Sequence, residues 1–342
     1  MPNYIMIKNL IIIFILSLPI VGFSQNDISI RTAYDWNQLE KSDQDLIEKS
    51  SWAYLVKLAN NDIEGFWESC HSKFKESTPF VSFKEMGEIV AGMINDINDV
   101  KFIDAKKVVF TTEPTSSQFS TGGSLDKENP TYLQFYTLEG IKNQALSIYK
   151  TENKPLSKAI TIKLGFENDE YKLTSIEINT NSINGKDANY YSKIANKWAE
   201  EESKLPQLIA LSMAYRLSYL GRGTSTSLSL NVIDTLQKLQ KNTDLISEMK
   251  IWNVNDTIFD IVNIDFLETQ NDVTPNIIYI SNVVLGEDST RKEVEILFEY
   301  FKNKYPNLVK EFGKFMFTAY EEYPAIRTKQ YKYFRVLMNE GE

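Results

Sequence analysis

The chain has 342 residues, 42% of them hydrophobic and 24% charged, a size and composition that predict two ordinary globular domains. The formal net charge of −9 disfavours binding to nucleic acid or anionic lipid, and no Lys/Arg cluster reverses it locally. One cysteine excludes an intrachain disulfide, and one histidine excludes multi-histidine zinc, copper and iron sites. No phosphate-binding loop or dinucleotide fingerprint is found, so we expect no cofactor.

Residues 1–24 have the pattern of a secretory signal peptide. Lys8 supplies the positive charge, Leu10–Val21 is an apolar run, and Gly22 and Ser24 are the small residues of a cleavage site. The run is shorter than the roughly 20 residues that span a bilayer. A retained anchor is the alternative, but the polar residues 25–31 bring no stop-transfer pattern. We expect an exported protein, periplasmic or secreted, with no transmembrane segment after signal removal.

Three helices are predicted next, from residue 42 to residue 98. Ser42 is a suitable N-cap for the first, and Asn60-Asn61-Asp62 separates it from the second. In the second helix Ile63, Trp67, Cys70 and Phe74 fall on one face. Ser82 is expected to begin the third, whose inward residues would be Met86, Ile89, Val90, Met93, Ile94 and Ile97.

After residue 98 the hydrophobic period changes to two, which predicts strands at 100–112, 132–138, 145–149, 159–166 and 171–178. Residues 167–170 form a hairpin turn between the last two, and the Ser-, Thr- and Gly-rich stretch 114–130 is expected to be a long loop. Helices followed by an antiparallel meander indicate an α+β domain over residues 36–180.

Two stretches carry a family resemblance. LANNDIEGFWESCHSKFKESTPFVSFKEM and the closing AITIKLGFENDEYKLTSIEI resemble small exported bacterial domains of the nuclear-transport-factor-two-like (cystatin-like cone) superfamily. The resemblance covers roughly residues 45–180 and implies a bent antiparallel sheet wrapped around helices, with a pocket inside the cone. The family has a short strand before its third helix, where this chain offers only Pro79–Val81.

Five residues are candidates for binding. Catalytic members of the superfamily often place a His, Asp or Tyr inside the cone, which draws attention to His71, Tyr132 and Tyr136, with Trp67 beside the histidine. On a helical wheel His71 lies about 80° from the centre of the apolar stripe. That position favours a boundary histidine satisfied by a backbone carbonyl over a general base, and ordinary sheet packing is favoured for the tyrosines.

The fifth candidate, Arg222, lies in the stretch GRGTSTS, residues 221–227. Such a loop can present backbone N–H groups and a cation to an anion, but no strand precedes it and a phosphate-loop lysine is missing. A Gly C-cap followed by a Ser/Thr N-cap between two helices is the favoured interpretation.

Residues 179–186 are polar and predict a linker to a second α+β domain at 187–342, for which no family is recognised. Pro206 begins an apolar helix through Leu220 that is expected to be central. A helix at 228–240 follows, then strands at 249–254, 258–267 and 277–285, a helix at 291–304 capped by Ser289, and strands at 315–320 and 331–337. Asp256, Asp260 and Asp265 do not fit a calcium loop and are expected to be solvated.

Three functions remain open. The favoured one is a non-catalytic exported protein that binds a small ligand, peptide or protein partner. A carboxylate-dependent hydrolase of glycan or peptide would need two acidic side chains about 5–9.5 Å apart in a cleft. A structural component of an envelope assembly would expose an apolar patch larger than a few hundred Å².

Overall fold

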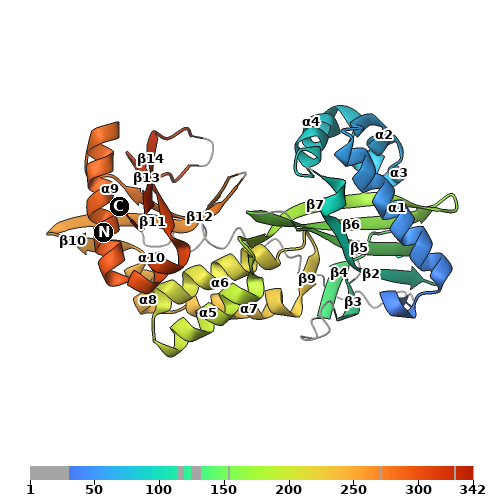
Figure 1. Ribbon diagram of the computed structural model, residues 1–342, viewed down its shortest axis with the longest axis horizontal. Helices are drawn as coiled ribbons and strands as arrows, with labels where there is room; N and C mark the ends of the chain where they lie inside the picture. The colour runs from blue at the N-terminus through green and yellow to red at the C-terminus, as the bar shows by residue number, and fades with distance from the viewer. Residues whose placement is uncertain are drawn as a thin grey trace.

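The computed structural model describes residues 31–94, 96–114, 119–124, 132–152, 155–269, 271–326 and 329–341 (Figure 1). The predicted signal peptide and most of the predicted 114–130 loop lie outside these residues. Within the described ranges, no helix combines the length and the hydrophobicity needed to cross a membrane. The fold is α+β, as predicted, with a curled antiparallel sheet, helices packed on it, and a second α+β unit.

The first sheet has six antiparallel strands in the order β1-β2-β5-β6-β7-β8. Register shifts between β2 and β5, and two more between β6 and β7, mark bulges that bend the sheet. The strands are β1 (Arg31–Asp35), β2 (Val100–Phe110), β5 (Asn143–Thr151), β6 (Leu156–Glu167), β7 (Glu170–Ile183) and β8 (Lys186–Asp187).

Four helices lie along one face of this sheet (Figure 1): α1 (Lys41–Ala59), α2 (Ile63–Glu68), α3 (Ser72–Ser77) and α4 (Phe80–Ala91). Their core is built from Leu55, Phe66 and Phe83, packed with Tyr149 and Ile162 of the sheet. Short 3₁₀ helices, η3 (Trp36–Gln38) and η4 (Ile97–Asp99), flank the group.

The prediction of one helix through residues 63–74 is wrong. The chain leaves the helix after Glu68 and restarts at Ser72, because the backbone N–H of His71 donates to the carbonyl of Leu173 in β7 at 2.9 Å. Phe66 is fully buried, whereas Trp67, which was expected on the buried face, is only partly buried. Pro79–Val81, the possible extra strand, forms the N-cap and first turn of α4 instead.

The opposite face of the sheet carries a small sheet in the order β3-β4-β9, made of β3 (Phe119–Ser124), β4 (Tyr132–Tyr136) and β9 (Thr224–Thr226). Strand β3 occupies part of the stretch predicted to be a loop. The predicted linker at 179–186 is also wrong in conformation, since β7 continues to Ile183 and turns directly into β8. Polar composition alone did not reveal these strands, because tertiary pairing decides them.

The second unit begins with α5 (Ala188–Glu200), α6 (Lys204–Ser218), α7 (Ser227–Leu239) and α8 (Thr243–Glu248). Its sheet has the order β10-β11-β12-β13-β14, and β12 and β13 are parallel. These strands are β10 (Ile251–Val254), β11 (Thr257–Glu268), β12 (Val273–Ile280), β13 (Lys314–Tyr320) and β14 (Tyr333–Asn339), with α9 (Glu287–Lys304) and α10 (Pro306–Phe312) connecting β12 to β13.

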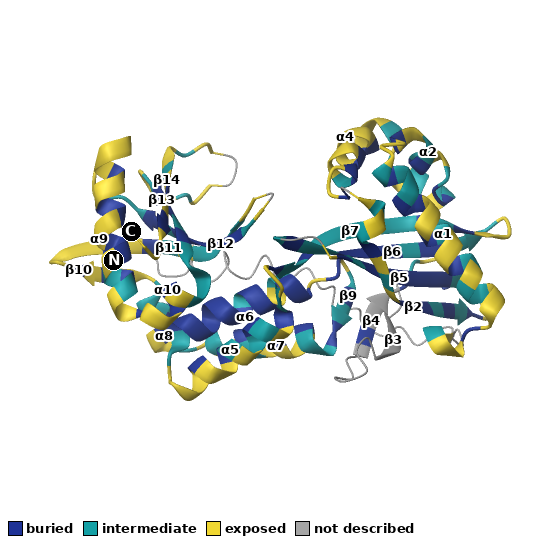
Figure 2. Cartoon of the chain, in the orientation of Figure 1, coloured by how far each residue is buried: buried dark blue, intermediate teal, exposed yellow. Residues whose placement is uncertain are grey.

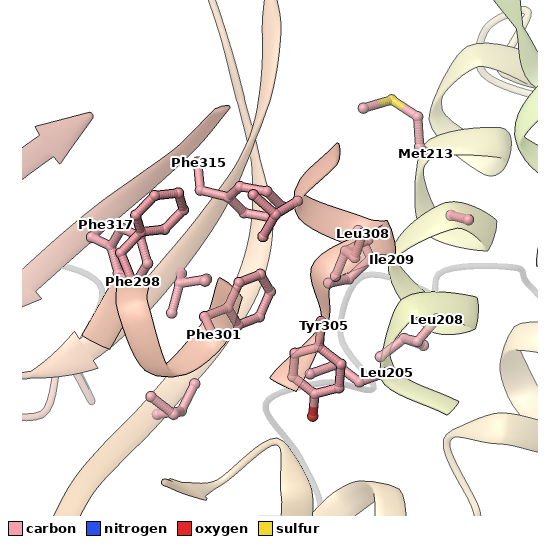
Figure 3. Packing of buried hydrophobic residues seen from close by; sticks show 14 of the residues in the cluster. Leu205, Leu208, Ile209, Met213, Phe298, Phe301, Tyr305, Leu308, Phe315 and Phe317 are labelled. Atoms are coloured by element: carbon pink, nitrogen blue, oxygen red, sulfur yellow. The ribbon is translucent and has the colours of Figure 1, made fainter. Parts of the chain in front are cut away.

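Helix α6 is central to this unit, as predicted. Figure 3 shows Leu205 and Ile209 of α6 beside Leu308 of α10, next to Phe301 of α9 and Phe315 of β13. Helices α8 and α10 were not predicted, and Gly286, not Ser289, is the N-cap of α9.

Candidate binding cavity

A cavity of about 280 Å³ lies between helices α1 to α4 and strand β7. Most of its lining is apolar, and the remaining residues carry hydroxyl groups. None of the lining residues carries an ionisable side chain. They are Leu58, Phe66, Phe74, Phe83, Met86, Val90 and Ile176, with Ser77, Thr78, Thr174 and Ser175.

Aromatic packing sets the shape of the cavity. Phe66 stacks on Phe83 with ring centroids 5.5 Å apart, and Phe74 meets Phe83 edge-on at 5.6 Å. Helix α4 comes close to α2 because Gly87 has no side chain, and a Cβ there would lie 2.8 Å from Cγ2 of Ile63. The rings and this close helix contact therefore hold one wall of the cavity in place.

Three of the six apolar residues predicted to face inward are exposed, whereas Ile94 is buried as predicted and Val90 and Ile97 are partly buried. The exposed fractions are 48% for Met86, 64% for Ile89 and 38% for Met93, and Val81 in the first turn of α4 is 85% exposed. Helix α4 instead buries Phe83, Gly87 and Ala91, a stripe at a spacing of four residues (Figure 2). Met86 and Val90 reach the cavity, so the apolar surface continues from the cavity onto the outer face of α4.

Trp67 does not line the cavity but supports its rim. Its indole Nε1 donates to the carbonyl of Thr78 at 2.9 Å, and its ring packs on Phe80 at 5.6 Å. Thr78 borders the cavity, so Trp67 fixes the turn from α3 to α4.

His71 is buried and caps α3 instead of facing the cavity. The backbone N–H of Lys73 donates to His71 Nδ1 at 3.2 Å, so the ring accepts from an N–H where a backbone carbonyl was expected as partner. Burial lowers the pKa of His71, while the Glu167 carboxylate, 3.9 Å from Nδ1, opposes this shift. A neutral, buried imidazole in a capping position has a structural role.

The neighbouring Cys70 is equally structural. Its thiol is fully buried and donates to the carbonyl of Phe66 at 3.3 Å. Burial raises the pKa of this thiol to about 12, which keeps it protonated and unreactive.

Arg222 lies on the other face of the sheet, where its loop binds the carboxylate of Glu177 in β7. The backbone N–H of Arg222 donates to both carboxylate oxygens of Glu177 at 2.7 and 2.6 Å, and the Lys163 amine donates to the Arg222 carbonyl at 2.8 Å. The predicted cap is present, since Thr226 accepts from the N–H of Ser229 at the start of α7.

The five predicted residues therefore do not meet at one site. Trp67 and His71 belong to the helical side, and Arg222 precedes β9 on the opposite side. Tyr132 and Tyr136 are the end residues of β4, which pairs with β9, and the structure describes their backbone only.

Sequence reasoning missed Phe66, Phe83 and the β7 residues of the cavity. A signal for β7 exists in the sequence. Its apolar residues fall at Tyr171 and Leu173, and the alternation then resumes one position late at Ile176. Such a phase slip indicates a bulge, and the register shift to β6 occurs there.

The acidic residues give no candidate metal site in the part of the chain that the structure describes. Within the described ranges, no group of three or more His, Cys, Asp or Glu side chains is placed to hold a metal ion. Asp265 is not solvated as expected, since the amide of Asn276 donates to its carboxylate at 2.9 Å and burial raises its pKa.

Comparisons with known proteins returned nothing: no protein-family model, no curated protein and no solved structure matches the chain. The cavity and its surroundings are therefore interpreted from their own chemistry.

Proposed function

We propose that this protein is a non-catalytic binding protein whose first domain takes an apolar group into the cavity between α1–α4 and β7. One observation carries the proposal, namely a cavity lined by apolar and hydroxyl side chains without an ionisable group. Acid–base or nucleophilic chemistry needs titratable groups in contact with the substrate, and this lining offers only hydroxyls without an adjacent base.

Two further points support binding. Apolar pockets with a few hydroxyls at one side are typical of ligand sites, where polar groups orient the bound molecule. The resemblance to the cystatin-like cone superfamily also implies a pocket between the helices and a bent sheet. The signal-like pattern of residues 1–24 supports a periplasmic or secreted setting for this binding.

The test uses Nile red, an uncharged dye whose fluorescence rises in apolar surroundings. The full chain should bind it, and Val90→Trp, which fills the cavity, should weaken binding by about tenfold or more. Ile89→Trp is the matched control, because Ile89 is the next residue on α4, is exposed and does not line the cavity. If Val90→Trp and Ile89→Trp bind Nile red with equal affinity, the dye does not bind in the cavity and the proposal is overturned.

A further inference from the structure

Strand β7 has an open edge. On one side β6 pairs with it along its length, but on the other side β8 reaches only Ser182 and Ile183. Towards its start, the edge groups of Leu173 are taken by the Tyr54 hydroxyl, which accepts from the N–H, and by the His71 N–H, which donates to the carbonyl. Between these two points, at residues 175–180, no described strand pairs with the outer edge.

This edge lacks the Lys and Pro residues that commonly protect edge strands against strand pairing. Natural edge strands are guarded by Lys or Pro residues, by short length or by a covering segment. The stretch SIEINT at 175–180 contains neither Lys nor Pro, and the carboxylate of its single charged residue, Glu177, is held by the Arg222 backbone. Most of the stretch is half-buried, as Figure 2 shows for β7.

The cavity borders the start of this edge. It touches Thr174, Ser175 and Ile176, which directly follow Leu173, and the last two of them belong to the stretch 175–180. Its volume of about 280 Å³ is just below the roughly 300–1,000 Å³ of sites for drug-sized molecules. That size suits one large apolar side chain better than a whole cofactor.

We propose that the ligand is an extended peptide segment that adds as a further strand to the edge of β7 at residues 175–180. One apolar side chain of the peptide enters the cavity, and an adjacent acidic residue pairs with Arg222. This inference rests on the proposed function and names its ligand class. Backbone hydrogen bonds along the edge supply affinity, and the cavity selects the side chain, as in other strand-addition complexes.

Charge complementarity selects the acidic residue. Glu177 follows Ile176, so its side chain points to the face opposite Ile176, and it holds the Arg222 backbone on that face. Arg222 is exposed, and none of the ion pairs found between described residues involves its guanidinium. In an added strand, the residue next to the cavity anchor faces the same side as Arg222, where a carboxylate can form a bidentate pair with the guanidinium.

The probe is a capped peptide, acetyl-Ser-Val-Glu-Phe-Thr-Val-Ser-amide, titrated into the full chain by calorimetry. Its apolar residues alternate onto one face, and its glutamate lies on the other. N-methylation of the amides that face β7 should weaken binding by about tenfold or more, while N-methylation of the alternate amides should leave it unchanged. Hydrogen exchange should show protection at alternate amides within residues 175–180.

Two further variants test the parts of the site. Val90→Trp should abolish the preference for Phe over Ala at the peptide's central position, and Arg222→Ala should abolish its preference for Glu over Gln. The Arg222 change keeps the backbone N–H that holds Glu177, so the loop stays in place.

The outcomes separate the two proposals. Nile red binding without peptide binding leaves the cavity function standing and overturns strand addition. Peptide binding that ignores the N-methylation pattern also overturns it. The full chain could instead form dimers in which residues 175–180 are protected from hydrogen exchange and which the peptide does not disrupt. A second copy of the chain would then occupy the edge, and this result would likewise overturn strand addition.

Discussion

Replacing Gly221 with alanine tests how the 219–224 loop is held on β7. Gly221 has a φ of +118°, a conformation that residues with a side chain rarely adopt. A Cβ at this position would lie 2.6 Å from Cδ and Oε2 of Glu177. The alanine variant must therefore strain its backbone and also push the Glu177 carboxylate away from the Arg222 N–H.

The expected cost combines both effects. Holding a non-glycine residue in this φ region costs about 1–3 kcal/mol. Losing a hydrogen bond to a charged group costs about 1.5–3 kcal/mol, and we take the lower end because this one is exposed. Gly221→Ala should thus lower the free energy of unfolding by about 3 kcal/mol, measured by urea titration with tryptophan fluorescence.

A matched glycine isolates the contribution of Glu177. Gly185 has a φ of +81°, but a Cβ there meets nothing within 4 Å, so Gly185→Ala should cost only about 1–2 kcal/mol. Adding Glu177→Ala to Gly221→Ala should cost less than the sum of the two single changes, because the clash has already removed the interaction. Equal effects of Gly221→Ala and Gly185→Ala would refute the contact between the loop and Glu177.

Two further predictions concern the helices above the sheet. Burial lowers the pKa of His71, so the unfolded chain binds its proton more readily, and stability should fall as the pH drops below about 6.5, the value in an unfolded chain. His71→Asn keeps a capping oxygen but removes the titrating ring, so the urea midpoint should depend less on pH between about pH 7.5 and 5.5. An unchanged dependence of the midpoint on pH would contradict this assignment. Phe66→Ala should cost about 3–5 kcal/mol because the ring is fully buried. The exposed Val81→Ala should stay within about 0.5 kcal/mol, and similar values for the two variants would argue against this core.

Local patterns in the sequence were sufficient where local chemistry decides the structure. Period-two alternation located β2, β5, β6 and β7, and the turn between β6 and β7 was visible in its residues. Asn168 and Asp169 adopt positive φ values of 53° and 64°, which suit a tight hairpin turn and are tolerated best by such residues. The predictions were therefore reliable for these four strands and for this turn.

Contacts between distant segments explain the remaining errors. The spacing of Ile63, Trp67, Cys70 and Phe74 fits one helix, and only the bond from His71 to Leu173 shows that the helix breaks. Helix α4 has more apolar residues than its buried stripe can use, so periodicity did not identify the inner face. The cavity involves both of these mispredicted features. It lies where α3 departs from α2 and beside the α4 helix, which buries Phe83, Gly87 and Ala91.

The two ends of the open edge are held by different parts of the molecule. At one end Tyr54 and His71 fix Leu173. At the other end the Thr180 hydroxyl donates to Glu268 of β11, whose carboxylate also pairs with Lys158 and Arg216. Burial acts to raise the pKa of Glu268, but these partners outweigh it and lower the pKa, so the carboxylate stays charged at neutral pH.

This arrangement makes the second unit relevant to the proposed peptide binding, although it lies outside the cavity. A strand that is already fixed at both ends loses little conformational freedom when a peptide pairs with it, which lowers the entropic cost of association. Glu268→Gln weakens the pairing at one end only and leaves the cavity lining unchanged. We therefore expect it to reduce peptide affinity while Nile red binding is retained. Loss of both in parallel would show that Glu268 supports the fold as a whole instead of the edge.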